Sequence, residues 1–260
     1  MTLKAAGGPS ITADTTCRIC GTKLTVEVSA ATYKRHNGNV TWRACDDCNA
    51  NEAAERERTI AAEYEEIHAN WLRERWRRRI GASGIPRKLV NPTLTAPPHD
   101  AMKAAVEFAN GTINGLLFTG PPGLGKTTIA GWAFARRLQH TPGIWRSAPI
   151  LVNDLQAEFG SDERRVANEL LSGRQMVALD DLDKARGTDY AASQIFAAIN
   201  EAYVNEQPLV VTSNLPLQDL ARRWPQPIGE TIADRLQEHC VRVVLTGATR
   251  RKPAQLPTQN

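Results

Sequence analysis

The sequence predicts an α/β fold: a mostly parallel sheet with helices on both faces, preceded by a small domain and a long helix. After Pro98, apolar strand patterns alternate with helix patterns, and this alternation is typical of parallel sheets. Residues 52–80 are rich in Ala, Glu and Arg and contain no Gly or Pro, which predicts a long helix. Upstream of that helix, four cysteines form two C-x-x-C pairs.

Composition fits this organisation. A chain of 260 residues with 42% hydrophobic residues suits one large domain plus a small one. The net charge of +4 is only a weak indication of an anionic partner. The first 14 residues are polar or small and do not resemble a signal peptide. Since no apolar run is long enough to cross a bilayer, we expect a cytoplasmic protein with no membrane partner.

The cysteine-containing segment is expected to fold as a hairpin. Val26 and Val28 alternate with polar residues, Asn37-Gly38 favours a tight turn, and residues 40–43 suit a return strand. Such a hairpin brings the two C-x-x-C pairs together, and four thiolates match a tetrahedral structural zinc site. Disulfides and a redox motif are the alternatives, and a cytosolic location disfavours disulfides. The predicted zinc ligands are Cys17, Cys20, Cys45 and Cys48.

The long helix has an apolar stripe and a segregated charge pattern. Acidic residues dominate its first half, and five arginines lie near its end. This order suits the helix dipole. The arginines, with Trp76 among them and Trp71 just before them, also suit contact with nucleic acid; both interpretations remain open. Gly81, Gly84 and Pro86 end the helix.

A complete G-x-x-x-x-G-K-T motif lies between a predicted strand at residues 115–119 and a predicted helix at residues 127–135. In this context the backbone N–H groups of the glycine-rich loop surround a phosphate. Lys126 is expected to bridge the β- and γ-phosphates, and the Thr127 hydroxyl to bind Mg²⁺. The predicted ATP-binding residues are Gly120, Pro121, Pro122, Gly123, Leu124, Gly125, Lys126, Thr127 and Thr128.

Polar residues follow further predicted strands. We expect a second strand at residues 150–152 and a third at 176–179. Asp180 and Asp181 follow the third strand directly. Asp180 is expected to hold Mg²⁺ through water, and Asp181 to orient or deprotonate the attacking water. Asn214 follows the next predicted strand, at residues 209–212, and is expected to bond that water or the γ-phosphate, the alternative being a turn residue.

Two arginines complete the set of candidates. Arg235 lies on a predicted helix and is a candidate arginine finger for the nucleotide of a neighbouring subunit. Arg250 follows a predicted strand at residues 241–245 and is a candidate contact to the γ-phosphate in its own subunit. An ordinary surface charge is the alternative for each.

These motifs, in this order, resemble AAA+ ATPases. Together with the entry segment Gly84-Ile85-Pro86-Arg87 they are similar to helicase loaders of the DnaC/DnaI type and to transposition helpers of the IstB type. The resemblance covers roughly residues 84–251. It implies that Asn214 is sensor 1, Arg235 the trans finger and Arg250 the sensor 2 arginine. It also implies that residues 153–165 contact single-stranded DNA. Asp183 departs from the family pattern, where glycine is common.

The sequence patterns and the resemblance together predict four segments: a zinc-binding domain at residues 1–50, a helical linker at 51–83, an AAA+ ATPase domain at 84–251 and a flexible tail at 252–260. It further implies an ATP-dependent loader of a replicative DNA helicase onto single-stranded DNA, which assembles as a homo-oligomer in the ATP state. Asp181 is shorter than the usual glutamate, so we expect slow hydrolysis. The alternatives are an IstB-like transposition helper and a non-catalytic zinc DNA-binding adaptor with a structural ATP site.

Overall fold

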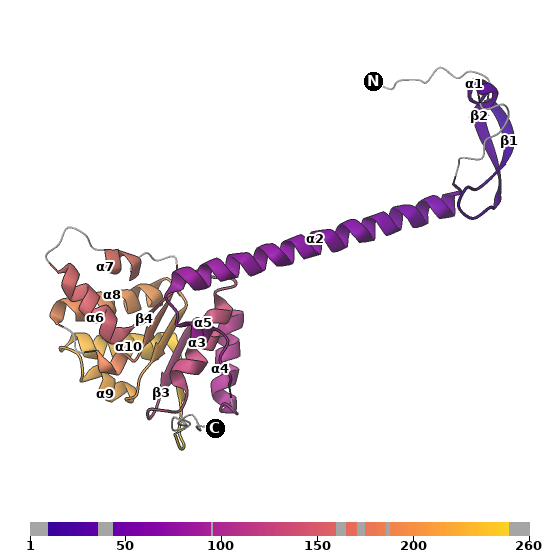
Figure 1. Cartoon of the computed structure of the whole chain (residues 1–260). Coiled ribbons are helices and arrows are strands. Elements are labelled where there is room, and N and C mark those ends of the chain that lie inside the picture. Colours follow the sequence, from indigo (N-terminus) through magenta and orange to yellow (C-terminus); the bar gives the residue numbers. More distant parts are fainter. Residues whose placement is uncertain are drawn as a thin grey trace, which may run out of the picture. The chain divides into compact units, whose positions relative to one another are not determined.

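A computed structural model describes residues 10–35, 44–94, 96–159, 165–170, 175–185 and 188–249 (Figure 1). The chain divides into two compact units, Met1–Trp71 and Leu72–Asn260. The division falls within the long helix α2 (Asp46–Ser83). The domain boundaries proposed from the sequence therefore stay predictions.

The first unit contains a two-stranded antiparallel sheet. Strand β1 (Ser10–Thr16) pairs with β2 (Lys23–Ser29), and Thr16 lies opposite Lys23 next to the connecting turn. Helix α1 (Ala30–Arg35) follows. The strand expected around Val26 and Val28 is confirmed, but its partner β1 was not predicted. The expected turn at Asn37-Gly38 and the return strand at residues 40–43 lie outside the described residues.

The core of this first unit is small. Ala13 and Val28 are its buried hydrophobic pair, and Val26 and Tyr33 pack partly against them. Such a core buries little apolar surface, so a domain of this size needs a further source of stability, such as a metal or disulfides.

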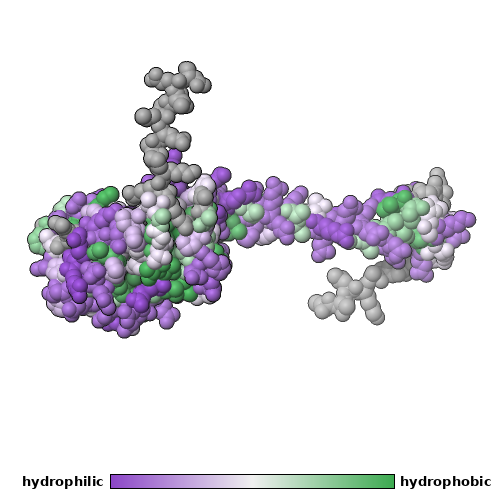
Figure 2. Space-filling model, turned by 90° about the horizontal axis from the view of Figure 1, so that it is seen from below, coloured by the Kyte–Doolittle hydropathy of each residue, from purple (hydrophilic) through white to green (hydrophobic). Residues whose placement is uncertain are grey.

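The predicted long helix is confirmed as α2, which has Asp46 and Asp47 in its first turn. Acidic residues at this end interact favourably with the helix dipole. Apolar side chains lie exposed along an otherwise mostly hydrophilic helix surface (Figure 2). These exposed side chains include Ile60, Tyr64, Ile67, Trp71 and Leu72.

The end of α2 packs against α5 (Lys126–Arg137). The indole N–H of Trp76 donates to the carbonyl of Ala135 at 2.7 Å. Arg79 donates to the carbonyls of Leu138 and Gln139, both at 3.0 Å. Trp76 and Arg79 therefore bind carbonyl groups at the C-terminal end of α5. The helix dipole favours a cation such as Arg79 at this end.

The second unit has a five-stranded parallel sheet, ordered β4-β5-β6-β3-β7. This confirms the predicted fold class. The strands expected at residues 115–119, 176–179, 209–212 and 241–245 are found within one residue of their predicted ends. The strands are β3 (Gly115–Thr119), β4 (Gly143–Ser147), β5 (Met176–Asp180), β6 (Leu209–Thr212) and β7 (Cys240–Val244).

Helices cover both faces of this sheet, with a hydrophobic core on each side (Figure 1). Side chains alternate between the two faces of a strand: Leu116 and Phe118 of β3 join one core, and Leu117 joins the other. The first core includes α3 (Arg87–Val90), α4 (His99–Asn110) and α5. The second includes α6 (Ala148–Glu158), α7 (Arg165–Leu170), α8 (Asp189–Val204), α9 (Leu217–Ala221) and α10 (Ile228–His239).

One predicted strand is wrong. Residues 150–152 belong to helix α6, and the strand before it is β4. Pro149 stands in the first turn of α6, where its missing N–H costs nothing. A short apolar run does not distinguish a buried strand from a buried helix, and here Leu151, Val152 and Leu155 form the buried face of the helix.

Residues 153–158 of the segment implied to contact DNA therefore continue α6, and residues 160–164 lie outside the described residues. No helix in the described part of the chain is long and apolar enough to cross a membrane.

Candidate functional site

The glycine-rich loop connects β3 to α5. Its backbone needs glycine: Gly120 has a φ of 132°, and a Cβ there would lie 2.1 Å from the carbonyl oxygen of Leu245. Gly125, with a φ of 91°, stands directly before the first residue of α5. The loop therefore ends at a helix N-terminus, which favours anions such as phosphate.

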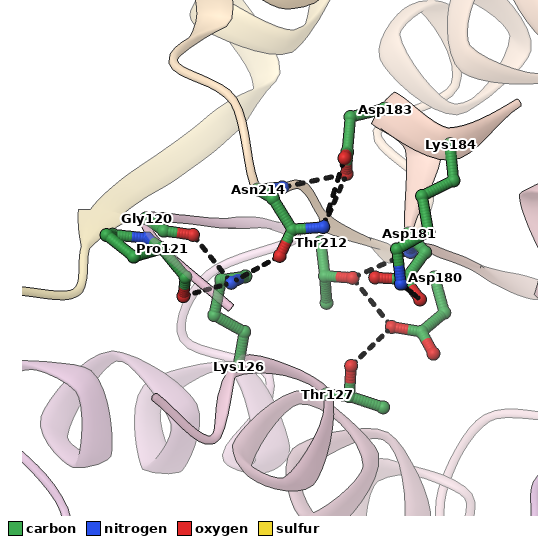
Figure 3. Close-up of polar contacts among 10 residues, drawn as sticks. All are labelled: Gly120, Pro121, Lys126, Thr127, Asp180, Asp181, Asp183, Lys184, Thr212 and Asn214. Carbon is green, nitrogen blue, oxygen red and sulfur yellow. Dashed lines mark hydrogen bonds and ion pairs between the residues drawn. The ribbon is translucent and has the colours of Figure 1, made fainter. Parts of the chain in front are cut away.

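Lys126 is the central cation of the loop (Figure 3). Its side chain is buried, and its Nζ donates to the carbonyls of Gly120 at 2.6 Å and Pro121 at 2.9 Å. A third bond, of 2.9 Å, reaches Oδ1 of Asn214. Burial lowers the pKa of Lys126, and the negative charges of Asp181 and Asp183 oppose this. The ammonium group is thus fixed at the mouth of the loop by three acceptors.

Thr127 meets Asp180 at the end of β5. The Thr127 hydroxyl donates to Oδ1 of Asp180 at 2.8 Å, and the hydroxyl of Thr212 donates to the same oxygen at 2.6 Å. Burial raises the pKa of Asp180, and both hydroxyl bonds oppose the shift. A hydroxyl beside a carboxylate supplies the hard oxygen ligands that Mg²⁺ prefers.

Asp181 follows with a left-handed backbone, at a φ of 56°. Its amide N–H donates to the Thr212 hydroxyl at 2.9 Å, and its carboxylate pairs with Lys184 at 2.6 Å. A left-handed conformation is uncommon for a residue other than glycine and often occurs at functional sites. Lys184 stands on the short 3₁₀ helix η1 (Leu182–Lys184). Neither Thr212 nor Lys184 was predicted as a site residue.

A cavity of about 350 Å³ lies over these groups, within the usual size range of small-molecule sites. Eight of its lining residues were predicted as site residues, including Lys126, Asp181 and Asn214. Its wall also includes Thr93, Leu94 and Pro97, which precede α4 and carry no recognisable motif. The cavity therefore has the polar glycine-rich loop on one side and the apolar residues Leu94 and Pro97 in its wall.

The two candidate arginines differ in placement. Arg235 lies on α10 and does not line the cavity. Its Nη1 bonds Glu238 at 2.8 Å, and its guanidinium stands 4.5 Å from the ring centroid of Tyr203. Arg250 lies outside the described residues, so its role stays a prediction.

The four cysteines of the first unit form one cluster. All four sulfur atoms lie within 4.8 Å of one another, and Cys20 Sγ is 3.7 Å from Cys45 Sγ. Zinc–thiolate bonds of about 2.3 Å in a tetrahedron place sulfurs about 3.8 Å apart. The cluster therefore fits a tetrahedral zinc site, and none of these cysteines is in a disulfide.

Backbone N–H groups in and near the turn between β1 and β2 stabilise the thiolate form of Cys17. The amides of Ile19 and Cys45 donate to Cys17 Sγ at 3.4 and 3.3 Å. Backbone hydrogen bonds, chiefly from Cys20 and Cys45, lower the pKa of Cys17 to about 6. Gly21, with a φ of 76°, closes this turn. A thiolate stabilised in this way is the form that binds zinc.

Comparisons with known proteins agree with this arrangement. The family model of IstB-like ATP binding proteins matches residues 100–257. The phage-like element PBSX protein XkdC of Bacillus subtilis is 28% identical over 145 residues, which make up 52% of this chain and 52% of XkdC. The chain thus spans about half the length of that relative.

Two solved structures share the fold. The DnaC helicase loader is 22% identical with a TM-score of 0.50, covering 62% of this chain and all of that one. The replication initiator DnaA bound to AMPPCP and single-stranded DNA is 18% identical with a TM-score of 0.53, covering 65% of this chain and 53% of that one. The chain belongs to the IstB-like ATP-binding protein family and has an AAA+ P-loop fold.

Proposed function

We propose that this protein is an ATP-dependent loader that places a replicative DNA helicase on single-stranded DNA, with ATP acting as an assembly switch. The observation that carries the ATPase part is the convergence of Lys126, Thr127 and Asn214 around one cavity, with Asp180 bonded to Thr127. The loader part rests on the fold shared with the DnaC helicase loader, together with a cysteine module and a long helix ahead of the ATPase fold.

The cavity suggests how ATP lies. The apolar wall of Leu94 and Pro97 suits the base, and the loop around Lys126 suits the β- and γ-phosphates. Thr127 and Asp180 would hold Mg²⁺, which neutralises charge on the phosphates. The side chains of Thr127 and Asp180 already lie in contact, so neither has to move far to hold the ion.

Asp181 is the proposed base for the attacking water. Its carboxylate is ion-paired with Lys184 at 2.6 Å. To contact the attacking water, this carboxylate has to share or give up its contact with Lys184. Slow hydrolysis follows from this pairing as well as from the short aspartate side chain, and it suits a switch whose two nucleotide states must persist.

The proposed assembly uses Arg235 as a finger in the neighbouring subunit's site. Its position on α10, away from the cavity of its own chain, is compatible with such a role. The guanidinium would exchange Glu238 for the γ-phosphate of the adjoining protomer. A phosphate group accepts paired bonds from a planar guanidinium as a carboxylate does, so this contact would favour the homo-oligomer in the ATP state and its loss on hydrolysis would loosen it.

Single-stranded DNA is the proposed second partner because DnaA, which shares the fold, has been solved bound to it. A transposition helper is the second candidate function, favoured by the IstB-like family description. The two differ in partner: a loader holds a ring helicase, and a helper recruits a transposase.

Zinc is the proposed metal of the cysteine cluster, held by Cys17, Cys20, Cys45 and Cys48. Its role would be structural, because four thiolates fill a tetrahedral shell and leave no open position. Metal binding would supply most of the folding free energy of a unit whose buried hydrophobic core is Ala13 and Val28.

Substitutions in the loop and at β5 test the ATPase. We expect Lys126→Ala to weaken ATP binding by roughly 100-fold, because charge-assisted bonds to phosphate are lost. Asp180→Asn should retain binding and lose phosphate release. Calorimetry measures the first effect and a phosphate assay with single-stranded DNA the second. Lys103→Ala, on the exposed side of α4, is the control. Tight binding without turnover in the wild type would favour the adaptor alternative.

Replacement of Arg235 tests the assembly switch. Arg235→Ala should bind ATP normally but lose at least about tenfold of its DNA-stimulated hydrolysis, since fingers act on the transition state. Arg222→Ala is a matched control, because Arg222 also pairs with an acid three residues away, Asp219 at 3.1 Å. Unchanged stimulated hydrolysis in Arg235→Ala would remove the finger from the proposal.

Metal removal tests the cysteine module. The purified protein should contain about one zinc per chain, measured by mass spectrometry, and Cys17→Ser should lose it together with the fold of the β1–β2 unit. ATP affinity should change little, because the second unit has its own cores. Cys240→Ala, in the second unit, should keep its zinc. A zinc-free wild-type protein with a stable β1–β2 sheet would argue against a zinc site.

Affinity capture distinguishes the two candidate functions. The full chain, held with a non-hydrolysable ATP analogue, should retain a hexameric helicase from host extract, identified by mass spectrometry. Lys126→Ala should retain much less, because assembly depends on nucleotide. Recovery of a transposase in place of a helicase would establish the second candidate function.

A further inference from the structure

Asp183 is a buried carboxylate that the proposed reaction does not yet use. It stands on η1, three residues after Asp180, and only 7% of its surface is exposed. Its carboxylate accepts the backbone N–H of Asn214 at 2.7 Å, and its two oxygens lie 3.0 and 3.3 Å from the Asn214 side-chain nitrogen. All these donors belong to one residue, 31 positions away in the chain.

The other end of the same amide faces the phosphate loop. Oδ1 of Asn214 accepts from Nζ of Lys126 at 2.9 Å, so the amide stands between a carboxylate and an ammonium group (Figure 3). The reverse orientation would place NH₂ against the ammonium and oxygen against the carboxylate. Both contacts would be repulsive, because an amide nitrogen only donates and its oxygen only accepts. The charges therefore fix the orientation of Asn214.

Asp183 does not need a negative charge merely to connect η1 to the backbone of Asn214. A neutral acceptor would satisfy the backbone N–H of Asn214, and burying a carboxylate is costly unless its charge is used. The main-chain carbonyl of Asp183 also accepts from Arg223 Nε at 3.2 Å, which fixes η1 itself. The carboxylate is thus held in place and bonds the backbone and the side chain of one residue, Asn214.

We propose that Asp183 is a positioning residue that holds Asn214 with its carbonyl oxygen toward the nucleotide. Asn214 then serves as an acceptor, for Lys126 and for a proton of the attacking water, and its NH₂ is kept away from the γ-phosphate. This inference rests on the proposed ATPase function. Asp183 fixes which atom of the Asn214 side chain, Oδ1 or Nδ2, faces the nucleotide, whereas an unconstrained asparagine can turn either atom toward it.

A double-mutant cycle tests the proposal. Asp183→Ala should lower kcat by roughly 10- to 100-fold, the range for losing a residue that orients a site group through hydrogen bonds, and change the dissociation constant of ATP by less than about threefold. In an Asn214→Ala background, Asp183→Ala should have almost no further effect, because the group through which it acts is absent. Additive losses would overturn the proposal. Asp219→Ala, an exposed carboxylate on α9, is the control and should leave kcat unchanged.

A second variant and a second readout separate positioning from folding. Asp183→Asn keeps the size and an acceptor for the Asn214 backbone but removes the charge, so kcat should lie between wild type and Asp183→Ala. In wild type, the Asn214 side-chain amide protons should exchange slowly in ¹⁵N NMR spectra, and they should exchange fast in Asp183→Ala. If neither variant folds, or if the Asn214 signals are unchanged, Asp183 does not position Asn214. If wild type releases no phosphate but its Asn214 amide is protected only while Asp183 is present, the ATPase proposal fails and the orientation of Asn214 stands.

Discussion

The parallel pairing of β3, β5 and β6 brings the whole nucleotide site together. In parallel strands the carboxyl ends meet at one edge, and here Phe118 pairs with Thr212 and Leu179 with Val211. A shift by one residue would turn Thr212 to the other face of the sheet, and its 2.6 Å bond to Asp180 would be lost. The two hydrophobic cores that fix this register are therefore a condition for the chemistry, and one of them reaches the cavity itself through Ile129.

Local patterns in the sequence were sufficient to find the groups that are proposed to contact phosphate and metal. The glycine loop, the acids after an apolar strand and the asparagine after the next strand each have a signature that depends on neighbours in the chain. The cysteine pairs are of the same kind. The wrong strand at residues 150–152 shows where this reasoning fails: three apolar residues carry no period, and Pro149 favoured a helix start that the pattern around it did not reveal.

The remaining contacts depend on folding and have no local signature. Lys126 meets Asn214 across 88 residues, and the apolar wall at Leu94 and Pro97 comes from a segment without a motif. Asp183 was visible in the sequence only as a departure from a family pattern, and its meaning required the distances to Asn214. The pairing of Arg235 with Glu238 follows helix spacing, but its ring contact with Tyr203 does not. The sequence thus predicted the residues proposed to contact ATP and Mg²⁺, and it did not reveal the residues that orient them, such as Thr212 and Asp183.

Helix α5 connects the nucleotide loop to the long helix. Its first residue, Lys126, belongs to the phosphate loop, and its C-terminal end receives Trp76 and Arg79 from α2. The carbonyls at that end carry the negative pole of the helix dipole, which a cation neutralises. A phosphate bound at the N-terminus would stabilise this helix through the same dipole as the arginine at its C-terminal end. The N-terminal end of α5 thus favours the negative charge of a phosphate at the loop, and its C-terminal end favours the positive charge of the Arg79 guanidinium.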